Sequence, residues 1–193
     1  MVRAAFLDRD GVINCKPPEG LYVTRWEEWH FLPGAAKAIG LLNRAGFRVI
    51  VVSNQRCVAK GLITPRELDA MHQRMCDELA AAGARIDGIY YCPHENQPSC
   101  GCRKPAPGML LAAARTHRID LAASWMIGDS DIDVQAGRNA GCRTARLRRS
   151  DETTRDDTDV LAPSLLEAVS QILRREKVVA DRRDSAALEL PGA

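Results

Sequence analysis

Residues 6–14 read Phe-Leu-Asp-Arg-Asp-Gly-Val-Ile-Asn, and this stretch decides how the chain folds. An apolar segment, residues 2–7, predicts a strand that ends at Asp8 and Asp10. Side chains two residues apart on a strand point the same way, and Gly11 allows the chain to turn immediately afterwards. We therefore expect both acids to converge at the carboxyl end of this strand, where open α/β sheets bind their ligands.

Two carboxylates this close together repel each other, and a bound cation is the usual remedy. Hard oxygen ligands of this type suit Mg²⁺, which in turn suits phosphate groups. The opening motif therefore predicts a magnesium site and chemistry on a phosphorylated substrate.

Composition and charge set the class of protein. With 193 residues, a net charge of +2 and 46% hydrophobic residues, the chain fits one well-buried globular domain. This charge gives no reason to expect nucleic acid or an anionic membrane as a partner, and no apolar run approaches the length of a membrane span. The first residues run directly into the acidic pair, so we expect no signal peptide and a cytoplasmic location. We also expect the protein to be a monomer.

Strand and helix patterns alternate along the chain. Strands are predicted over residues 2–7, 48–53, 86–91, 124–127 and 143–147, and helices over 34–45, 107–117, 132–140 and 164–175. Another helix is predicted to begin at Pro65, because Thr64 and Glu67 form a capping box with proline at the first helical position.

This alternation predicts an α/β fold, a Rossmann-like parallel sheet with helices on both faces. Residues 1–175 form the single predicted domain, and the charged residues 176–193 are predicted to be a flexible tail. No large insertion separates Asn14 from Ser53, so we expect a minimal cap.

Polar side chains follow several of the predicted strands. Ser53 and Asn54 end the second strand, Arg103 and Lys104 follow the third, and a Gly-Asp pair ends the fourth. In a parallel sheet these strand ends share one edge, so a hydroxyl, two cations and several carboxylates gather there. Phosphoryl transfer needs such a set, namely a nucleophile, positioning groups and charge neutralisation.

The cysteines indicate a second metal site. An odd count of seven cysteines argues against a disulfide framework. Cys92, His94, Cys100 and Cys102 form a C-x-H…C-x-C set within a proline-containing loop. Three thiolates and one imidazole make a closed tetrahedral Zn²⁺ shell, which is structural because no coordination position stays open. This zinc-binding loop leads directly into Lys104 and would position it.

The order of these parts over residues 1–150 resembles the haloacid dehalogenase (HAD) superfamily of phosphatases. The resemblance implies that Asp8 is the nucleophile that forms an aspartyl-phosphate. It implies that Asp10 protonates the leaving oxygen, deprotonates the attacking water and offers its backbone carbonyl to Mg²⁺. Ser53 and the backbone N–H of Asn54 would hold the phosphoryl oxygens.

The same resemblance assigns the remaining charges. Lys104 would hold the nucleophile and the phosphate together. Asp129 would ligate Mg²⁺ directly, and Asp133 would support it.

Together with the zinc loop, the chain is similar to the D-glycero-D-manno-heptose 1,7-bisphosphate phosphatases and their histidinol-phosphate relatives. The matching stretches are residues 6–14, 91–94 and 102–110. The resemblance implies removal of the 7-phosphate of the heptose, a step towards lipopolysaccharide or another glycoconjugate. Histidinol phosphate or another small phosphomonoester is the alternative substrate. Two further alternatives are a non-catalytic zinc-loop interaction module and a nucleic-acid 3′-phosphatase, although the latter needs a basic groove with stacking aromatics.

A sugar bisphosphate also needs cations for its distal phosphate, and Arg56, Lys60 and Arg103 are the candidates. Residues 19–32 contain four aromatic residues and are predicted to cover the pocket, with Trp29 and Phe31 assigned to packing. The isolated histidines are assigned to surface or packing positions: His30, His72 and His117.

Two positions depart from the heptose enzymes. Ser130 stands where those enzymes usually have lysine, which removes a positive charge beside Asp129. Cys57 replaces a common glycine in a turn.

Overall fold

The computed structural model describes residues 1–95, 100–148 and 158–188, with side chains to residue 178. Its centre is one six-stranded sheet in the order β3-β2-β1-β4-β5-β6. All neighbouring strands pair in parallel. The strands are β1 (Ala4–Leu7), β2 (Arg48–Asn54), β3 (Gly88–Cys92), β4 (Trp125–Gly128), β5 (Arg143–Leu147) and β6 (Val160–Ala162). The predicted parallel sheet is confirmed.

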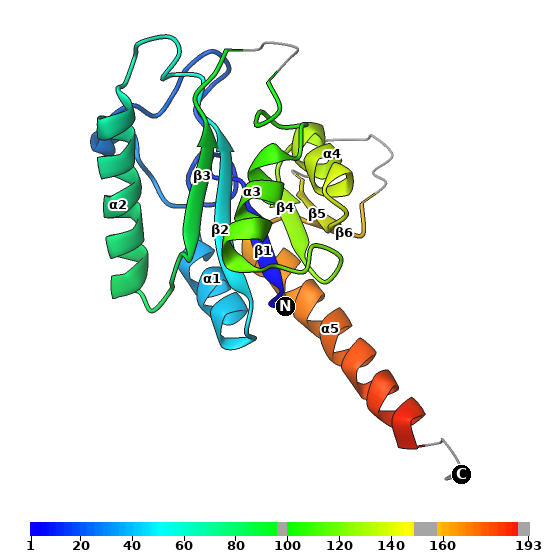
Figure 1. The fold of residues 1–193 in the computed structure, drawn as a ribbon. Helices are drawn as coiled ribbons and strands as arrows, with labels where there is room; N and C mark the ends of the chain where they lie inside the picture. Colours follow the sequence, from blue (N-terminus) through cyan, green and yellow to red (C-terminus); the bar gives the residue numbers. More distant parts are fainter. Residues whose placement is uncertain (96–99, 149–157, 189–193) are drawn as a thin grey trace.

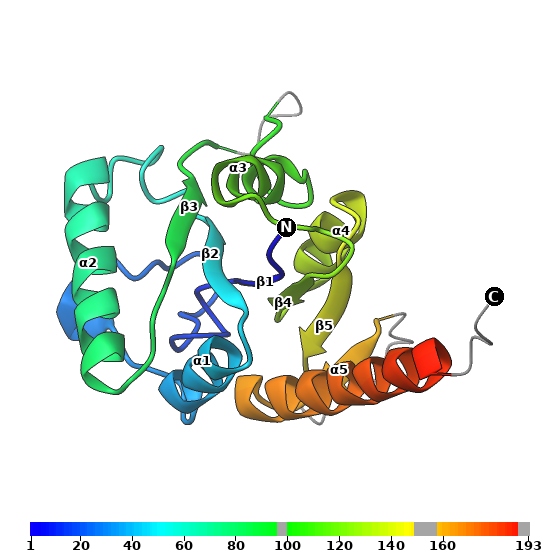
Figure 2. The ribbon, with the colours of Figure 1, turned by 60° about the horizontal axis from the view of Figure 1, so that its bottom comes forward.

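Helices cover both faces of this sheet, as predicted. One face packs against α1, α2 and α5, and the other packs against α3 and α4; Figure 2 shows α1 and α5 on the side opposite α3 and α4. The helices are α1 (Ala35–Arg44), α2 (Pro65–Ala81), α3 (Gly108–His117), α4 (Asp131–Asn139) and α5 (Leu165–Leu188), with a short 3₁₀ turn η1 (Trp26–Glu28). No helix in the described part of the chain is long and apolar enough to cross a membrane.

Strand β1 shows why this sheet is buried on both sides. Ala5 and Leu7 belong to the core under α1, α2 and α5, whereas Ala4 and Phe6 belong to the core under α3 and α4. All four residues have no exposed surface. Successive side chains along β1 therefore enter opposite cores. The side chains on both faces must be apolar, which explains why the hydrophobic run of this strand is continuous.

Two features differ from the sequence predictions. Strand β6 was missed, because only Val160 and Ala162 of its three residues are buried and so short a pattern gives little signal. The predicted helix end at residue 175 is wrong, because α5 continues to Leu188 through most of the predicted tail. Within this extension, Glu176 accepts hydrogen bonds from Arg3 and Trp125 and pairs with Arg143. These long-range contacts leave no trace in a local charge pattern.

The strand order determines at which edge of the sheet a ligand can bind. From β1 the chain builds β2 and β3 on one side, then returns to place β4 on the other side of β1. The carboxyl ends of β1 and β4 therefore form the topological switch point at which α/β sheets bind ligands. Figure 1 shows the segment after β3 at this edge and the N-terminus at the opposite edge.

The capping box of α2 gives a first testable prediction. The Thr64 hydroxyl accepts a hydrogen bond from the Glu67 backbone N–H at 3.2 Å, and the Glu67 carboxylate accepts one from the Thr64 N–H at 2.8 Å. Thr64→Ala should lower the free energy of unfolding by about 1 kcal/mol, measured by urea denaturation. Thr116→Ala is the control, because that exposed hydroxyl only donates to a carbonyl within α3. An equal effect of both substitutions would contradict the capping role.

Candidate active site

Three carboxylates meet at the carboxyl ends of β1 and β4. Asp8 follows β1, Asp129 follows β4, and Asp133 lies in the first turn of α4. One carboxylate oxygen from each lies within 4.8 Å of the other two. The predicted gathering of carboxylates at these strand ends is therefore present. The expectation that the side chains of Asp8 and Asp10 converge on one point is not met, because Asp10 is held by Arg9, Asn14 and Gln55 and is not part of this cluster.

Lys104 lies beneath this cluster and neutralises part of it. Its Nζ lies 2.8 Å from Asp8 Oδ1 and 2.6 Å from Asp133 Oδ1, and it donates a 2.9 Å hydrogen bond to the Val52 carbonyl. The residue is only 2% exposed. Burial alone would lower the pKa of Lys104, but the two carboxylates outweigh burial and raise it, so the ammonium stays charged.

One oxygen of the Asp8 carboxylate is engaged by neighbouring groups. Its Oδ1 accepts hydrogen bonds from Lys104 and from the Arg9 backbone N–H at 2.7 Å, and Oδ2 takes part in neither contact. Burial raises the pKa of Asp8 to about 7, with Lys104 opposing the shift and Asp133 adding to it. An added cation near Oδ2 would favour the charged, reactive form.

The residues present fit a hard divalent cation. Oδ1 of Asp129 is buried and has no hydrogen-bond partner among the described residues, although a buried carboxylate oxygen normally has one. Burial raises the pKa of Asp129, a cost that Lys16 only partly offsets. Asp133 is fixed by Ser130, whose backbone N–H and hydroxyl both donate to Oδ2. An all-oxygen set with an unsatisfied buried oxygen is suited to Mg²⁺.

Asp10 lies in a separate hydrogen-bond network beside the cluster. Its carboxylate pairs with the Arg9 guanidinium at 2.9 Å and accepts hydrogen bonds from Asn14 at 2.8 Å and Gln55 at 3.1 Å. Burial would raise the pKa of Asp10, but Arg9 and these hydrogen bonds lower it overall. Asp10 is therefore a carboxylate in the unliganded site.

The end of β2 contributes positioning groups. Gln55 donates to the Ser53 hydroxyl at 2.6 Å as well as to Asp10, so it links the two residues. The Asn54 side chain accepts from the Lys104 backbone N–H at 3.0 Å and donates to its carbonyl at 3.1 Å. Asn54 therefore fixes the backbone that carries Lys104, a role that was not predicted.

The three candidate distal cations lie outside the carboxylate cluster. Arg56 pairs with Glu95, Arg103 donates to the His94 carbonyl, and Lys60 lies 5.3 Å from the ring centre of Tyr22. The structure thus places them around the segment after β3 and the segment before η1. Their role at a distal phosphate stays a prediction.

The four predicted zinc ligands come together. Sγ of Cys100 lies 3.3 Å from Sγ of Cys102 and from Nδ1 of His94, and Sγ of Cys92 lies 3.6 Å from Sγ of Cys100. In a tetrahedral site with Zn–S bonds of about 2.3 Å, neighbouring ligand atoms lie about 3.8 Å apart. All three cysteines are free thiols. This cluster therefore has the composition and approximate size of a structural zinc site.

Comparisons with known proteins agree with this geometry. A family model described as HAD-hydrolase-like matches residues 101–168. D-glycero-β-D-manno-heptose-1,7-bisphosphate 7-phosphatase from Rhodopseudomonas palustris is 43% identical, over 77% of this chain and 84% of the relative. The Escherichia coli K12 enzyme of the same name is 37% identical, over 89% and 92%. The chain belongs to this phosphatase family.

A solved structure extends the match to three dimensions. The D,D-heptose 1,7-bisphosphate phosphatase of B. bronchiseptica, complexed with magnesium and phosphate, superimposes with a TM-score of 0.81 at 34% identity. The match covers 90% of this chain and 99% of that structure. This HAD-type phosphatase therefore has the fold of its family, and it is a phosphoric monoester hydrolase.

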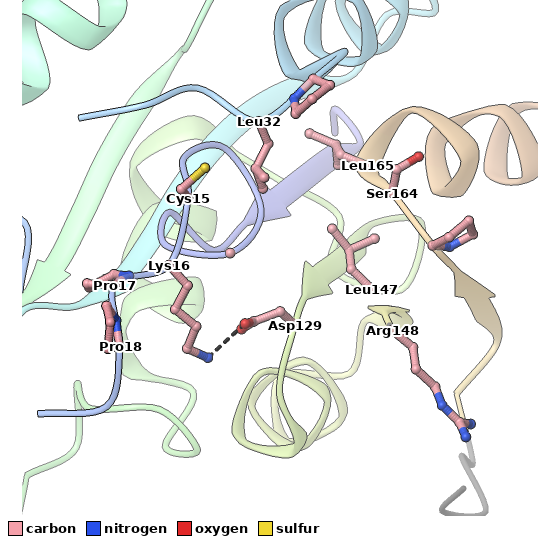
Figure 3. Close-up of a pocket in the computed structure, with 13 residues that line it drawn as sticks. Cys15, Lys16, Pro17, Pro18, Leu32, Asp129, Leu147, Arg148, Ser164 and Leu165 are labelled. Carbon is pink, nitrogen blue, oxygen red and sulfur yellow. Dashed lines mark hydrogen bonds and ion pairs between the residues drawn. The ribbon is translucent and has the colours of Figure 1, made fainter. Parts of the chain in front are cut away.

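Lys16 is a site residue that the sequence analysis missed. In this phosphatase its Nζ lies 2.7 Å from Asp129 Oδ2, as the dashed line in Figure 3 shows. Lys16 thereby brings positive charge to Asp129 from the segment after β1. A single lysine in a proline-containing loop has no periodic signal, so the sequence could not show this contact.

Lys16 also borders the open space beside the site. A hollow of about 730 Å³ lies between Lys16, Gly11 and Asp129 on one side and Leu147 and the start of α5 on the other (Figure 3). A second hollow of about 570 Å³ begins on the other side of Lys16 and is lined by residues 20–24. The aromatic residues of segment 19–32 therefore form only part of the predicted cover of the pocket. Tyr22 lines this hollow, whereas the ring of Trp26 stacks on that of Trp29 with ring centres 5.4 Å apart.

The close approach of Gly11 to Asp129 gives a second prediction. Gly11 has φ +90°, and a Cβ at this position would lie 2.4 Å from Asp129 Oδ2. Gly11→Ala should therefore displace Asp129 and lower kcat by at least about 100-fold, the usual scale for loss of a positioned catalytic group. Gly20→Ala is the matched control, because Gly20 has φ +83° but open space around its Cβ position. It should cost about 1 kcal/mol of stability and leave phosphate release intact, and similar kinetics for both variants would contradict the clash.

Proposed function

We propose that this protein removes the 7-phosphate from D-glycero-β-D-manno-heptose 1,7-bisphosphate through an aspartyl-phosphate intermediate. The observation that supports it most strongly is the cluster of Asp8, Asp129 and Asp133 around the Lys104 ammonium. The substrate follows from the named activity of relatives that align over most of this chain.

In the proposed first step, Asp8 Oδ2 attacks phosphorus and the bond from phosphorus to the C7 oxygen breaks. Asp10 gives its proton to the departing oxygen, so the sugar leaves as an alcohol. In the second step, Asp10 takes a proton from water, which attacks phosphorus and releases Asp8 with inorganic phosphate. The two steps leave both acids in their starting states.

The low pKa of Asp10 matches the second step, in which the residue must act as a base. The first step requires Asp10 to hold a proton. An approaching phosphate dianion favours this, because negative charge beside a carboxyl group raises its pKa.

We propose that Mg²⁺ is held by Asp8, Asp129 and the backbone carbonyl of Asp10, with Asp133 as outer support. When bound, Mg²⁺ supplies charge neutralisation for the phosphoryl oxygens and for the crowded carboxylates. Lys104 neutralises the same oxygens from the protein side, and Ser53 and the Asn54 backbone N–H donate hydrogen bonds to them. For the distal phosphate we propose Arg56, Lys60 and Arg103.

We also propose that Cys92, His94, Cys100 and Cys102 bind a structural Zn²⁺. Cys102 lies two residues before Lys104, so fixing this cysteine restricts the backbone that delivers the buried ammonium. Zinc would therefore act on catalysis through position and not through contact with the substrate.

The substrate is tested by Mg²⁺-dependent phosphate release from a panel of phosphate esters. The panel contains both anomers of heptose 1,7-bisphosphate, fructose 1,6-bisphosphate, histidinol phosphate and a 3′-phosphorylated oligonucleotide. We expect the highest kcat/KM for the β-heptose anomer. Preference for histidinol phosphate would retain the mechanism and replace the substrate, and no release from any ester would overturn the proposed function.

In the same assay, Asp8→Asn should abolish phosphate release from every ester, because the amide keeps the shape of the side chain and removes the nucleophile. Asp77→Asn on the exposed surface of α2 is the control and should retain wild-type rates. Retained activity of Asp8→Asn would remove Asp8 from the nucleophile role.

Cys100→Ser should release zinc, measured by atomic absorption, and lower the melting temperature, because three ligands hold a structural metal far more weakly than four. Cys76→Ser on α2 is the control, because Cys76 lies far along the chain from the cluster and should leave the zinc content unchanged. Full zinc occupancy in Cys100→Ser would refute the four-ligand assignment.

A further inference from the structure

Arg9, between the two aspartates of the opening motif, is fully buried. Its side chain is only 1% exposed, although arginine is almost never fully buried unless its charge is paired. The buried guanidinium must therefore place each of its N–H groups against a specific partner.

Two sides of the guanidinium are occupied by defined groups. Nε and NH2 donate to Asp10, with NH2 reaching both carboxylate oxygens at 3.0 and 2.9 Å. NH1 lies 3.2 Å from Nε2 of His72 on α2. The ring of Trp29 lies 5.3 Å from the guanidinium carbon, within the range of a cation–π contact. Arg9 is therefore fixed in position between Asp10 and α2.

The contact with Arg9 determines the state of His72. A guanidinium has only donors, so Nε2 of His72 must be the acceptor and the proton of the neutral ring must be on Nδ1. His72 is 3% exposed and packs against Tyr91 with ring centres 5.7 Å apart. A second positive charge here would face Arg9 without solvent. His72 therefore functions as a buried acceptor, in contrast to the packing role that its isolated place in the sequence predicts.

We propose that His72 is a positioning residue for proton transfer: it holds the Arg9 guanidinium, and Arg9 holds the Asp10 carboxyl in the orientation needed to serve the leaving oxygen. This inference rests on the proposed function, in which Asp10 is the acid and base. Without the acceptor on α2, the buried NH1 group loses its partner, and Arg9 must shift to recover one. Asp10, which receives three contacts from Arg9, shifts with it.

This role has a kinetic signature that packing does not share. An alkoxide leaves slowly unless it is protonated, whereas p-nitrophenolate leaves readily without a proton. Misplacing Asp10 should therefore lower kcat/KM, which reports the first step, much more for a sugar phosphate than for p-nitrophenyl phosphate. The second step starts from the same aspartyl-phosphate with either ester and does not enter kcat/KM. Loss of packing alone would disturb Asp8 and Lys104 as well and would lower kcat/KM for both esters by the same factor.

The test compares the Mg²⁺-loaded wild-type protein with three variants on both esters, using the best sugar phosphate of the panel. His72→Leu fills the space but removes the acceptor, and should lower kcat/KM for the sugar phosphate by about 100-fold while changing kcat/KM for p-nitrophenyl phosphate little. His72→Gln, whose amide oxygen can replace Nε2, should recover most of the rate. His117→Leu is the control, because His117 packs edge-on against Tyr90, which belongs to the core on the opposite face of the sheet.

Equal losses on both esters with His72→Leu, or no recovery with His72→Gln, would overturn the inference and leave the proposed function standing. A wild-type protein that hydrolyses neither ester would overturn the proposed function itself. Should His72→Leu not fold, His72→Asn carries the same test, because its amide is polar but its oxygen stops short of Arg9.

Discussion

The Lys104 ammonium is the constraint on which the rest of the structure depends. It lies between Asp8 and Asp133 and donates to the Val52 carbonyl, with almost no access to water. Without it, Asp8, Asp129 and Asp133 would be like charges in a dry space, and they would protonate or move apart. Much of the surrounding structure places this one charge: Asn54 binds its backbone, and the cysteine-rich segment ends just before it.

Two separate hydrogen-bond networks lie around this charge. The carboxylates at the ends of β1 and β4 and in the first turn of α4 pair with lysine ammonium groups, whereas Asp10 is turned towards Arg9, Asn14 and Gln55. Asp8 and Asp10, the proposed nucleophile and proton carrier, are only two residues apart, yet they have opposite pKa shifts because their partners differ. This separation allows one short turn to supply two carboxyl groups for the two proposed tasks.

Local sequence signals predicted the parts of the site that depend on local structure. The strand before Asp8, the capping box at Thr64 and the spacing of Cys92 to Cys102 are each encoded within a few residues, and the structure agrees with them. Lys16, Arg9 and His72 escaped prediction because their partners lie on other elements, and one sequence does not show which elements pack together. The same reason explains the unexpected length of α5, whose Glu176 is tied to β4 and β5 and to Arg3 just before β1.

The parallel strand order also sets the sequence in which the site can assemble during synthesis. The proposed zinc ligands Cys92, His94, Cys100 and Cys102 lie close together in the sequence, so they can meet as soon as that segment emerges. Asp8 meets Asp129 only after β4 has been made and inserted beside β1, across most of the chain. Such long-range pairing is the slow part of folding. A nascent chain would thus bring its proposed zinc ligands together early and complete its carboxylate cluster late, so an incomplete chain would contain the first set of ligands without being a hydrolase.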